Sequence, residues 1–337
     1  MKKHVKFLLC LVIAFTMVFA FAACGNQGAG GGGGGAAAGP GGIDASDDLY
    51  IGVYAASAID YFYDHKLGVE QFAKDYGVKT EFLGPTDYDM SAVVATMDQS
   101  IARKPDGIAI IGWEESLIPS IDKAIAAGIP TVTMDADLPD SKRICFVGTG
   151  NYAAGKLNGQ AMADLLGGQG TVALVGMVTL SNISARMDGC RDVFANYPGI
   201  EIVDTITTEA DETVAATNTA ALLQKFPNLD GICTLDGTSP GVATAVREAG
   251  KAGQIKIVAF DRGENVLEAI EEDWITATVV QQTALMPWYS FLVCYNLKHF
   301  PVSMSSDNEA AGVSGVPGDI DTGVILVNKD NVKYFKR

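Results

Sequence analysis

The chain has 337 residues, 48% of them hydrophobic and 19% charged, so it is long enough for a packed core and favours two domains over one. Its formal net charge of -16 argues against a nucleic-acid groove, because phosphate binding needs clustered lysine and arginine. Three histidines and six scattered cysteines, without C-x-x-C or H-E-x-x-H spacing, argue against a zinc or iron site. The composition indicates an acidic, soluble α/β protein without a metal or cofactor.

The first 23 residues have the pattern of a secretory signal peptide. Lys2, Lys3 and Lys6 precede the segment Phe7–Ala23, which is apolar except for Thr16. At about 1.5 Å per residue this segment spans about 26 Å, slightly less than a bilayer core of about 30 Å. The small residues at its end favour cleavage over the alternative, a retained anchor helix. Removing the three lysines takes the formal charge from -16 to -19.

Residues 24–47 predict a flexible tether. The glycine-rich part, Gly25–Gly42, contains no β-branched residue and has nothing to bury. Such a chain reaches about 24 Å on average, enough to hold a folded body clear of a membrane.

From Leu49 onward, apolar strands alternate with helices. Strands are expected at 49–55, 78–83, 107–111, 131–134, 172–175, 201–206, 231–234 and 255–260, and helices at 61–76, 90–103, 117–127, 184–196, 213–226 and 241–249. Continuous apolar strands between helices imply parallel sheets that are covered on both faces.

The two halves of the body echo each other. Gly107–Asp135 and Gly231–Asp261 each run from a strand through a helix and a glycine turn to a second strand that ends in an acid. Two similar lobes are therefore expected. Ligands of parallel sheets sit beyond the carboxyl ends of the strands, so the residues that line a cleft between the lobes are expected at 57–62, 112–115, 135–137, 179–186, 236–239 and 261–263.

Several segments resemble the type I periplasmic sugar-binding proteins, of the ribose-binding kind. The matching segments are Leu49–Gly77, Lys104–Asp137, Ser184–Phe194 and Ile255–Gln281, with the strongest likeness in Ala127–Asp135, Ala185–Gly189 and Val258–Asp261. This family is similar in fold to the lactose-repressor effector domain. Here a secretory N-terminal segment stands in place of the helix-turn-helix of a repressor, which favours a receptor over a repressor.

The resemblance implies two Rossmann-like α/β lobes with parallel sheets, joined by three crossover segments. The N-terminal lobe is expected at 48–150 plus about 283–311, and the C-terminal lobe at 151–281 plus about 312–337.

The resemblance also implies a set of ligand-binding residues. In the first lobe they fall on Asp60, Tyr61, Phe62, Trp113, Glu114, Asp135 and Asp137, and in the second lobe on Arg186, Asp236, Asp261 and Gln281. An arginine that often follows the first-lobe aspartate is Ala136 here, and the family's asparagine falls on Leu235, so Asp236 is taken as its substitute. These departures leave the identity of the ligand open.

The residue types suit a sugar without reference to the family. Tyr61, Phe62 and Trp113 offer faces for the C–H side of a sugar ring, while the carboxylates and Arg186 can bind its hydroxyl groups. Each residue also has a plainer interpretation. Phe62 could belong to the core, Trp113 could plug the surface, Asp135 and Asp261 could be caps or turn residues, Arg186 could be solvated, and Asp137 and Glu114 are as readily structural.

No catalytic residues are expected. No serine or cysteine nucleophile has a plausible histidine partner, and a carboxylate-pair glycosidase is the enzymatic alternative. Gly150–Leu157 nearly matches the P-loop motif, but Leu157 stands where a serine or threonine is needed. We therefore interpret this segment as the helix that opens the second lobe. Asp135, Asp137 and Asp140 lack the glycine and glutamate of a calcium loop.

Phe21–Gly25 resembles the bacterial lipobox, in which the cysteine, here Cys24, is acylated and becomes the N-terminus. That resemblance implies a lipoprotein on the outer face of the cell membrane. The remaining cysteines, Cys145, Cys190, Cys233 and Cys294, favour buried thiols over disulfides.

We therefore expect a monomeric, lipid-anchored binding protein that delivers a monosaccharide or polyol to the permease subunits of an ABC importer and binds no nucleic acid. The alternative is a receptor that reports a sugar or autoinducer to a membrane signalling protein.

Overall fold

The computed structural model of the chain describes residues 39–57, 60–308 and 310–337. The expected signal peptide and Cys24 lie outside these residues.

The described residues form two six-stranded sheets. The first has the strand order β11-β5-β4-β3-β1-β2 and the second β12-β10-β9-β8-β6-β7. The strands of the first sheet are β1 (Leu49–Val53), β2 (Lys79–Leu83), β3 (Gly107–Ile111), β4 (Thr131–Met134), β5 (Cys145–Gly148) and β11 (Asp319–Asp321). Those of the second are β6 (Gln169–Val175), β7 (Gly199–Ile206), β8 (Gly231–Thr234), β9 (Lys256–Phe260), β10 (Ala277–Gln281) and β12 (Val324–Asn328). The pairings are parallel apart from that of β12 with β10.

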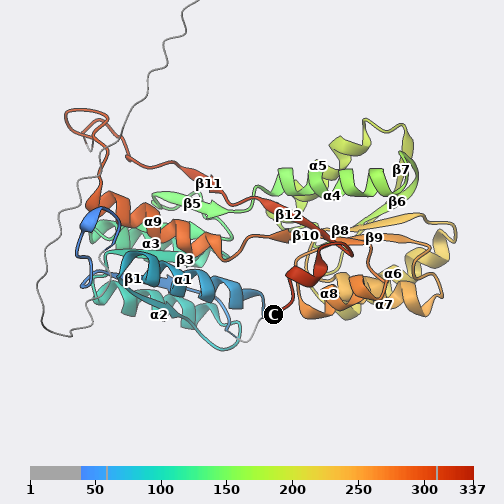
Figure 1. Cartoon of the computed structure of the whole chain (residues 1–337), viewed down its shortest axis with the longest axis horizontal. Coiled ribbons are helices and arrows are strands. Elements are labelled where there is room, and N and C mark those ends of the chain that lie inside the picture. The colour runs from blue at the N-terminus through green and yellow to red at the C-terminus, as the bar shows by residue number, and fades with distance from the viewer. Residues whose placement is uncertain (1–38, 58–59, 309) are drawn as a thin grey trace, which may run out of the picture. The chain divides into compact units, whose positions relative to one another are not determined.

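Helices cover both faces of each sheet, as Figure 1 shows. Those of the first lobe are α1 (Tyr63–Tyr76), α2 (Met90–Ala102), α3 (Ile118–Ala126) and α9 (Leu285–His299). Those of the second are α4 (Asn151–Leu165), α5 (Ser181–Phe194), α6 (Glu212–Lys225), α7 (Ser239–Glu248) and α8 (Glu264–Glu271). The expected two-lobed α/β fold is confirmed.

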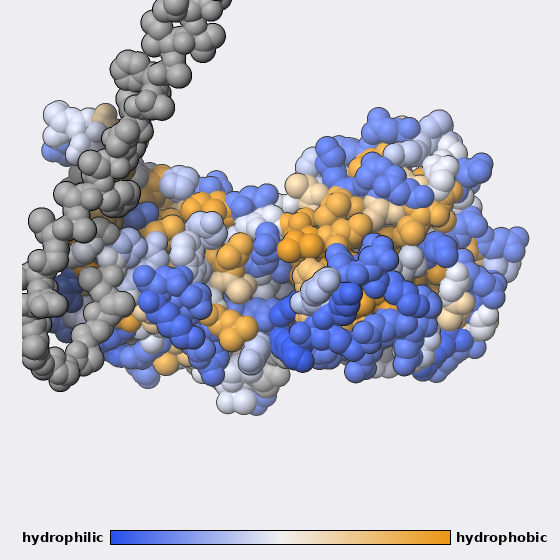
Figure 2. All heavy atoms as spheres, viewed as in Figure 1, coloured by the Kyte–Doolittle hydropathy of each residue, from blue (hydrophilic) through white to orange (hydrophobic). Residues whose placement is uncertain are grey.

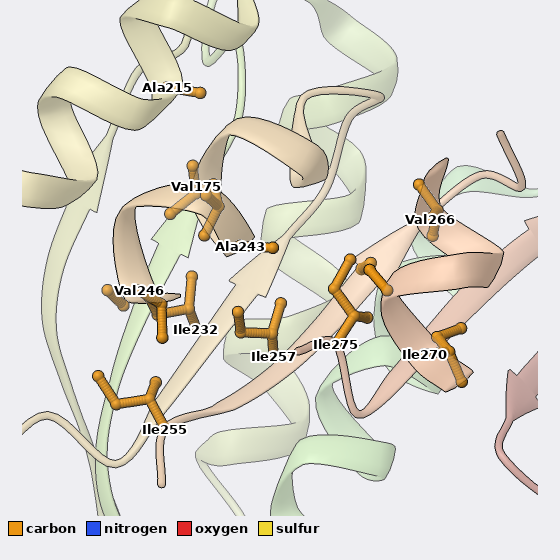
Figure 3. Close-up of a cluster of buried hydrophobic side chains, with 14 of the residues drawn as sticks. Val175, Ala215, Ile232, Ala243, Val246, Ile255, Ile257, Val266, Ile270 and Ile275 are labelled. Atoms are coloured by element: carbon orange, nitrogen blue, oxygen red, sulfur yellow. The ribbon is translucent and has the colours of Figure 1, made fainter. Parts of the chain in front are cut away.

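Each sheet buries an apolar cluster on either face. In the second lobe, Ile232 and Ile257 of neighbouring strands pack against Ala243 and Val246 of α7, as the close-up in Figure 3 shows. Residues from α4, α5 and the opposite sheet face form a separate cluster. Because apolar side chains leave the sheet in both directions, the strand sequences are continuously hydrophobic rather than alternating.

Three crossovers join the lobes, between β5 and α4, between β10 and α9, and between β11 and β12. The third differs from the sequence-based expectation, which assigned residues from about 312 onward to the second lobe. Asp319–Asp321 instead extends the first sheet by pairing with β5, and the Asp321 carboxylate accepts a hydrogen bond from the Gly150 amide at 2.8 Å. The crossover therefore follows Asp321.

The expected tether is too long at its C-terminal end. Pro40–Gly42 forms a 3-10 turn, the Gly39 amide donates to the Ile43 carbonyl, and Ala45 is 3% exposed in the first-lobe core. Ile43 also packs on this cluster. Since these residues bury apolar surface, the folded body extends back at least to Gly39, not merely to Asp48.

Local sequence sets the helix ends. Gly77 ends α1 in the left-handed conformation at φ 68°, where glycine has no steric penalty. Asp89 begins α2 by accepting hydrogen bonds from the amides of Ser91 and Ala92. Asp211 caps α6 in the same way.

The P-loop-like segment lies in α4, as expected. Its glycine at 155 permits close packing of two helices, because a Cβ there would lie 1.9 Å from the carbonyl oxygen of Arg186 in α5. A Cβ at Gly189 of α5 would similarly lie 2.2 Å from the carbonyl oxygen of Tyr152 in α4. The contact between α4 and α5 therefore fixes the backbone position of Arg186.

The four cysteines of the body are free and buried, which confirms the preference for thiols. In the part of the chain that the structure describes, no helix is long and apolar enough to cross a membrane. The same residues contain no group of three or more histidine, cysteine, aspartate or glutamate side chains that could hold a metal ion.

On the face seen in Figure 2, hydrophilic residues cover α7 and α8, and hydrophobic residues gather over α4 and α5.

Gly155→Ala is expected to lower the free energy of unfolding by about 1–3 kcal/mol, because overpacking the α4–α5 contact outweighs the gain in helix propensity. Urea unfolding followed by circular dichroism measures this difference. Gly318→Ala is the control, since a Cβ there meets no atom within 4 Å. Equal stability of the two variants would contradict the close approach.

Candidate functional site

Asp135 and Asp261 occupy equivalent positions in the two lobes. Each directly follows a strand, β4 or β9, and each has a left-handed backbone, with φ of 65° and 68°. Their amides donate to equivalent strand carbonyls, Asp135 to Val147 at 3.0 Å and Asp261 to Val279 at 2.9 Å. Aspartate tolerates this backbone region better than most residues. The two repeats noted in the sequence therefore end in the same local geometry.

Tyr61 lies against the first of these carboxylates. Its hydroxyl donates to Oδ1 of Asp135 at 2.6 Å. Burial raises the pKa of Tyr61 well above its ordinary value, and the charges of Asp135 and Asp261 raise it further. Tyr61 is consequently a neutral hydrogen-bond donor at physiological pH. Its pKa is raised by a carboxylate from each lobe.

The neighbouring aromatic residues form a continuous layer. The Phe62 ring lies 5.3 Å from Tyr61 and 5.4 Å from Trp113, and Trp113 lies 5.5 Å from Tyr88. Phe62 is 3% exposed and belongs to the core, which agrees with its plainer interpretation, whereas Trp113 is partly exposed. Tyr61 and Trp113 therefore both pack against Phe62, which belongs to the core cluster.

Arg186 is buried, so the alternative of a solvated side chain is wrong. Its three nitrogens donate to Asn151 Oδ1 at 2.8 Å, to the Leu235 carbonyl at 2.9 Å and to Gln281 Oε1 at 3.2 Å. Its guanidinium carbon lies 3.8 Å from the centre of the Phe260 ring. Burial lowers the pKa of Arg186, and the charges of Asp261, Asp135 and Asp236 oppose that shift.

Gln281 links the second-lobe residues to the crossovers. Its amide nitrogen donates to Asp261 Oδ1 at 2.8 Å, and its oxygen accepts from Thr149 Oγ1 at 2.7 Å. Burial raises the pKa of Asp261, Arg186 lowers it, and the charges of Asp135 and Asp236 raise it. Asp261 therefore shares its electrostatic environment with the first-lobe carboxylate.

Tyr61, Asp135, Arg186, Asp261 and Gln281 are thus brought together from both lobes. We call these five residues the central cluster. Tyr61, Asp135 and Asp261 keep partial exposure, while Arg186 and Gln281 are buried.

Three other residues proposed from the sequence have structural partners instead. Asp236 accepts four hydrogen bonds, from the Met177 amide, the Thr208 hydroxyl, and the amide and hydroxyl of Thr238. These occupy about all the acceptor sites of a carboxylate, so in this structure Asp236 organises the loop.

Asp137 forms an ion pair with Arg143 and accepts from the Thr133 hydroxyl. Glu114 is exposed and accepts from the Tyr88 hydroxyl at 2.5 Å. The side chain of Asp60 lies outside the described residues.

His65 is a buried polar residue that the sequence did not single out. It is fully buried, its ring is stacked on Phe82 at 6.5 Å, and neither ring nitrogen has a hydrogen-bond partner among the described residues. Burial lowers the pKa of His65, and the charge of Asp135, the nearby Tyr61 backbone and the charge of Asp64 oppose this. It occupies a core position of α1, where an apolar residue fits the helical pattern, so no sequence signal marks it.

Comparison with known proteins places this geometry in a family. The chain matches the periplasmic binding protein domain over residues 51–299. The chain belongs to the periplasmic binding protein family. Within this family it is a type I sugar-binding protein of the kind that serves ABC importers, and it is a binding protein rather than an enzyme. Family membership also implies an extracytoplasmic location.

Individual relatives support this placement. The D-apiose import binding protein of Paraburkholderia graminis is 30% identical over 63% of this chain and 69% of its own. The structure of AraP, an arabinose-binding protein from Geobacillus stearothermophilus, superposes with a TM-score of 0.81 at 32% identity over 86% of this chain and all of AraP. The XylFII–LytSN complex contains a chain that superposes with a TM-score of 0.67 at 28% identity over 84% of this chain and 98% of its own.

His65→Leu is expected to stabilise the protein more at pH 5.5 than at pH 8. Because the folded state holds the pKa of His65 below its unfolded value of about 6.5, the unfolded state takes up the proton first as the pH falls, and the wild type loses stability. The variant should gain about 1 kcal/mol at pH 5.5, measured by urea unfolding at both pH values. A variant that loses the same stability at pH 5.5 and at pH 8 would show that the imidazole makes favourable interactions in the folded state.

Proposed function

We propose that the protein captures a small neutral or amine-bearing sugar or polyol at the central cluster and delivers it to the permease of an ABC importer. The observation that carries this proposal is the meeting of two equivalent carboxylates, Asp135 and Asp261, beside Tyr61 and Arg186. Asp135 from one lobe and Asp261 from the other can accept hydrogen bonds from hydroxyl groups on opposite sides of a ring. Trp113 and Tyr61 supply aromatic faces for its C–H groups.

The charges of the central cluster argue against an acid sugar. Asp135 and Asp261 face one arginine, and each nitrogen of Arg186 already donates to a protein acceptor. A uronate would bring a third carboxylate without a second cation to balance it. A ligand that offers hydroxyl or ammonium donors suits the available acceptors better, and the apiose and arabinose named for the relatives are neutral pentoses.

A receptor that reports a sugar to a membrane sensor is the second candidate. It is favoured by the likeness to XylFII in its complex with LytSN. Neighbouring genes distinguish the two, since permease and ATPase genes support import and a histidine kinase or chemoreceptor gene supports sensing. In either role the chain works as a monomer that binds no nucleic acid and needs no cofactor.

A thermal-shift panel of monosaccharides, polyols, amino sugars and uronates tests the ligand class. We expect a neutral or amine-bearing compound to raise the Tm and uronates to have no effect. Asp135→Asn should weaken binding of the active compound at least tenfold, because a hydrogen bond to a charged group contributes about 1.5–3 kcal/mol.

Asparagine also tolerates the left-handed backbone, so the Tm of the empty variant should stay close to that of the wild type. Asp140→Asn is the matched control, because Asp140 is exposed on the same loop. Tight binding of glucuronate or galacturonate, or equal affinity of the two variants, would overturn the proposed ligand class.

We further propose that Cys24 is acylated and anchors the protein to the outer face of the membrane. Expressed in a bacterial host, the full chain should fractionate with membranes and Cys24→Ser should not, since one acylated residue supplies the hydrophobic attachment. Cys145→Ser is the control for loss of a buried thiol. Membrane recovery of Cys24→Ser in the same amount as the wild type would exclude the anchor.

A further inference from the structure

Two arginines of the second lobe meet one carboxylate of the first. Arg262 donates from Nε to Oδ2 of Asp64 at 2.9 Å and from Nη2 to Oδ1 at 2.7 Å. Arg337 donates from Nη2 to Oδ1 at 3.1 Å. Asp64 is 7% exposed and lies in the first turn of α1, whereas Arg262 follows β9. The contact therefore joins the two lobes outside the crossovers.

The C-terminal segment takes part in this contact. The Phe335 carbonyl accepts from Arg262 Nη1 at 3.0 Å, the Arg337 amide donates to Glu264 at 3.3 Å, and Lys336 pairs with Glu271 at 2.6 Å. These bonds attach the segment to the loop after β9 and to α8 of the second lobe. Figure 1 marks the C-terminus between the two lobes. There the Arg337 guanidinium lies 4.3 Å from the Tyr63 ring of the first lobe.

The contact lies next to the central cluster on both sides. Arg262 directly follows Asp261, and Asp64 lies three positions after Tyr61. The same approach of the lobes that brings Tyr61 towards Asp261 therefore also brings Asp64 to Arg262. Neither Asp64 nor Arg262 belongs to the central cluster, so their contact can stabilise the approach without touching a ligand.

We infer that Asp64, Arg262 and Arg337 form a closure latch, an ion-pair contact that holds the lobes in the arrangement that encloses the central cluster. The inference rests on the proposed capture of a ligand between the lobes. The latch makes Asp64 and Arg262 positioning residues for binding, and it gives Arg337 a part in ligand retention.

The chemistry of the latch predicts its sensitivity to salt. The bidentate geometry and the burial of Asp64 favour a strong contact. The side chains of Arg262 and Arg337 are 23% and 26% exposed, so dissolved ions screen part of the attraction.

Small-angle X-ray scattering of the protein alone tests the latch without any ligand. We expect Arg262→Gln and Asp64→Asn each to increase the radius of gyration, the double variant to add little, and high salt to have the same effect on the wild type. Arg337→Gln should give a smaller increase.

The matched control is Arg103→Gln, which removes a bidentate pair with Glu81 inside the first lobe. Circular dichroism confirms that each variant is folded. A radius of gyration that is unchanged in all three latch variants would overturn the inference.

A second measurement connects the latch to binding. For the compound of the thermal-shift panel that raises the wild-type Tm most, Arg262→Gln should bind about tenfold more weakly, with a faster dissociation rate and an unchanged association rate, because less of the protein is in the enclosing arrangement. An unchanged dissociation rate would contradict a role in retention. If no compound of the panel binds, the proposed function fails, while the scattering result still decides the latch.

Discussion

The structure of the site depends on the burial of one positive charge. Taking a guanidinium group out of water is costly unless its donors are satisfied and negative charge lies close by. Arg186 meets both conditions, since its three nitrogens have acceptors and Asp261, Asp135 and Asp236 surround it. Asn151 and the carbonyl of Leu235 are thereby held in place, and Gln281 is oriented so that its amide donates to Asp261. The arginine therefore organises the second-lobe half of the site.

Close helix packing carries that arrangement into the core. Gly155 lets α4 approach the backbone of Arg186, and the first residue of α4, Asn151, accepts from the Arg186 side chain. The helix that opens the second lobe thus contacts Arg186 through both backbone and side chain. The glycines that suggest a phosphate-binding loop in the sequence serve this packing instead.

Much of the fold follows from the sequence, because periodicity and glycine turns are local signals. β3, β4 and β8 have the expected bounds, and the internal repeat identifies Asp135 and Asp261 as equivalent. The sequence does not reveal which carboxylates are already occupied. Asp236 is an aspartate that follows its strand within two residues, much as Asp261 directly follows β9, yet its acceptors are filled by three loop residues. That difference arises from tertiary contacts that no spacing rule encodes.

The contact of Asp64 with Arg262 also cannot be predicted from the sequence. The two residues are 198 positions apart, and no local pattern connects them. For a similar reason the sequence does not indicate that β11 belongs to the first sheet. It is only three residues long and two of them are aspartates, so it lacks the apolar pattern by which a strand is found.

The burial of the four cysteine thiols affects how readily they react in an oxidising environment. Burial raises the pKa of Cys145 to about 11 and those of Cys233 and Cys294 above the ordinary range of a thiol. Only the thiolate reacts readily with oxidants and disulfides, so burial and a raised pKa protect these three thiols while the chain is folded. An unfolded chain loses that protection. Oxidation of its exposed thiols would then compete with refolding.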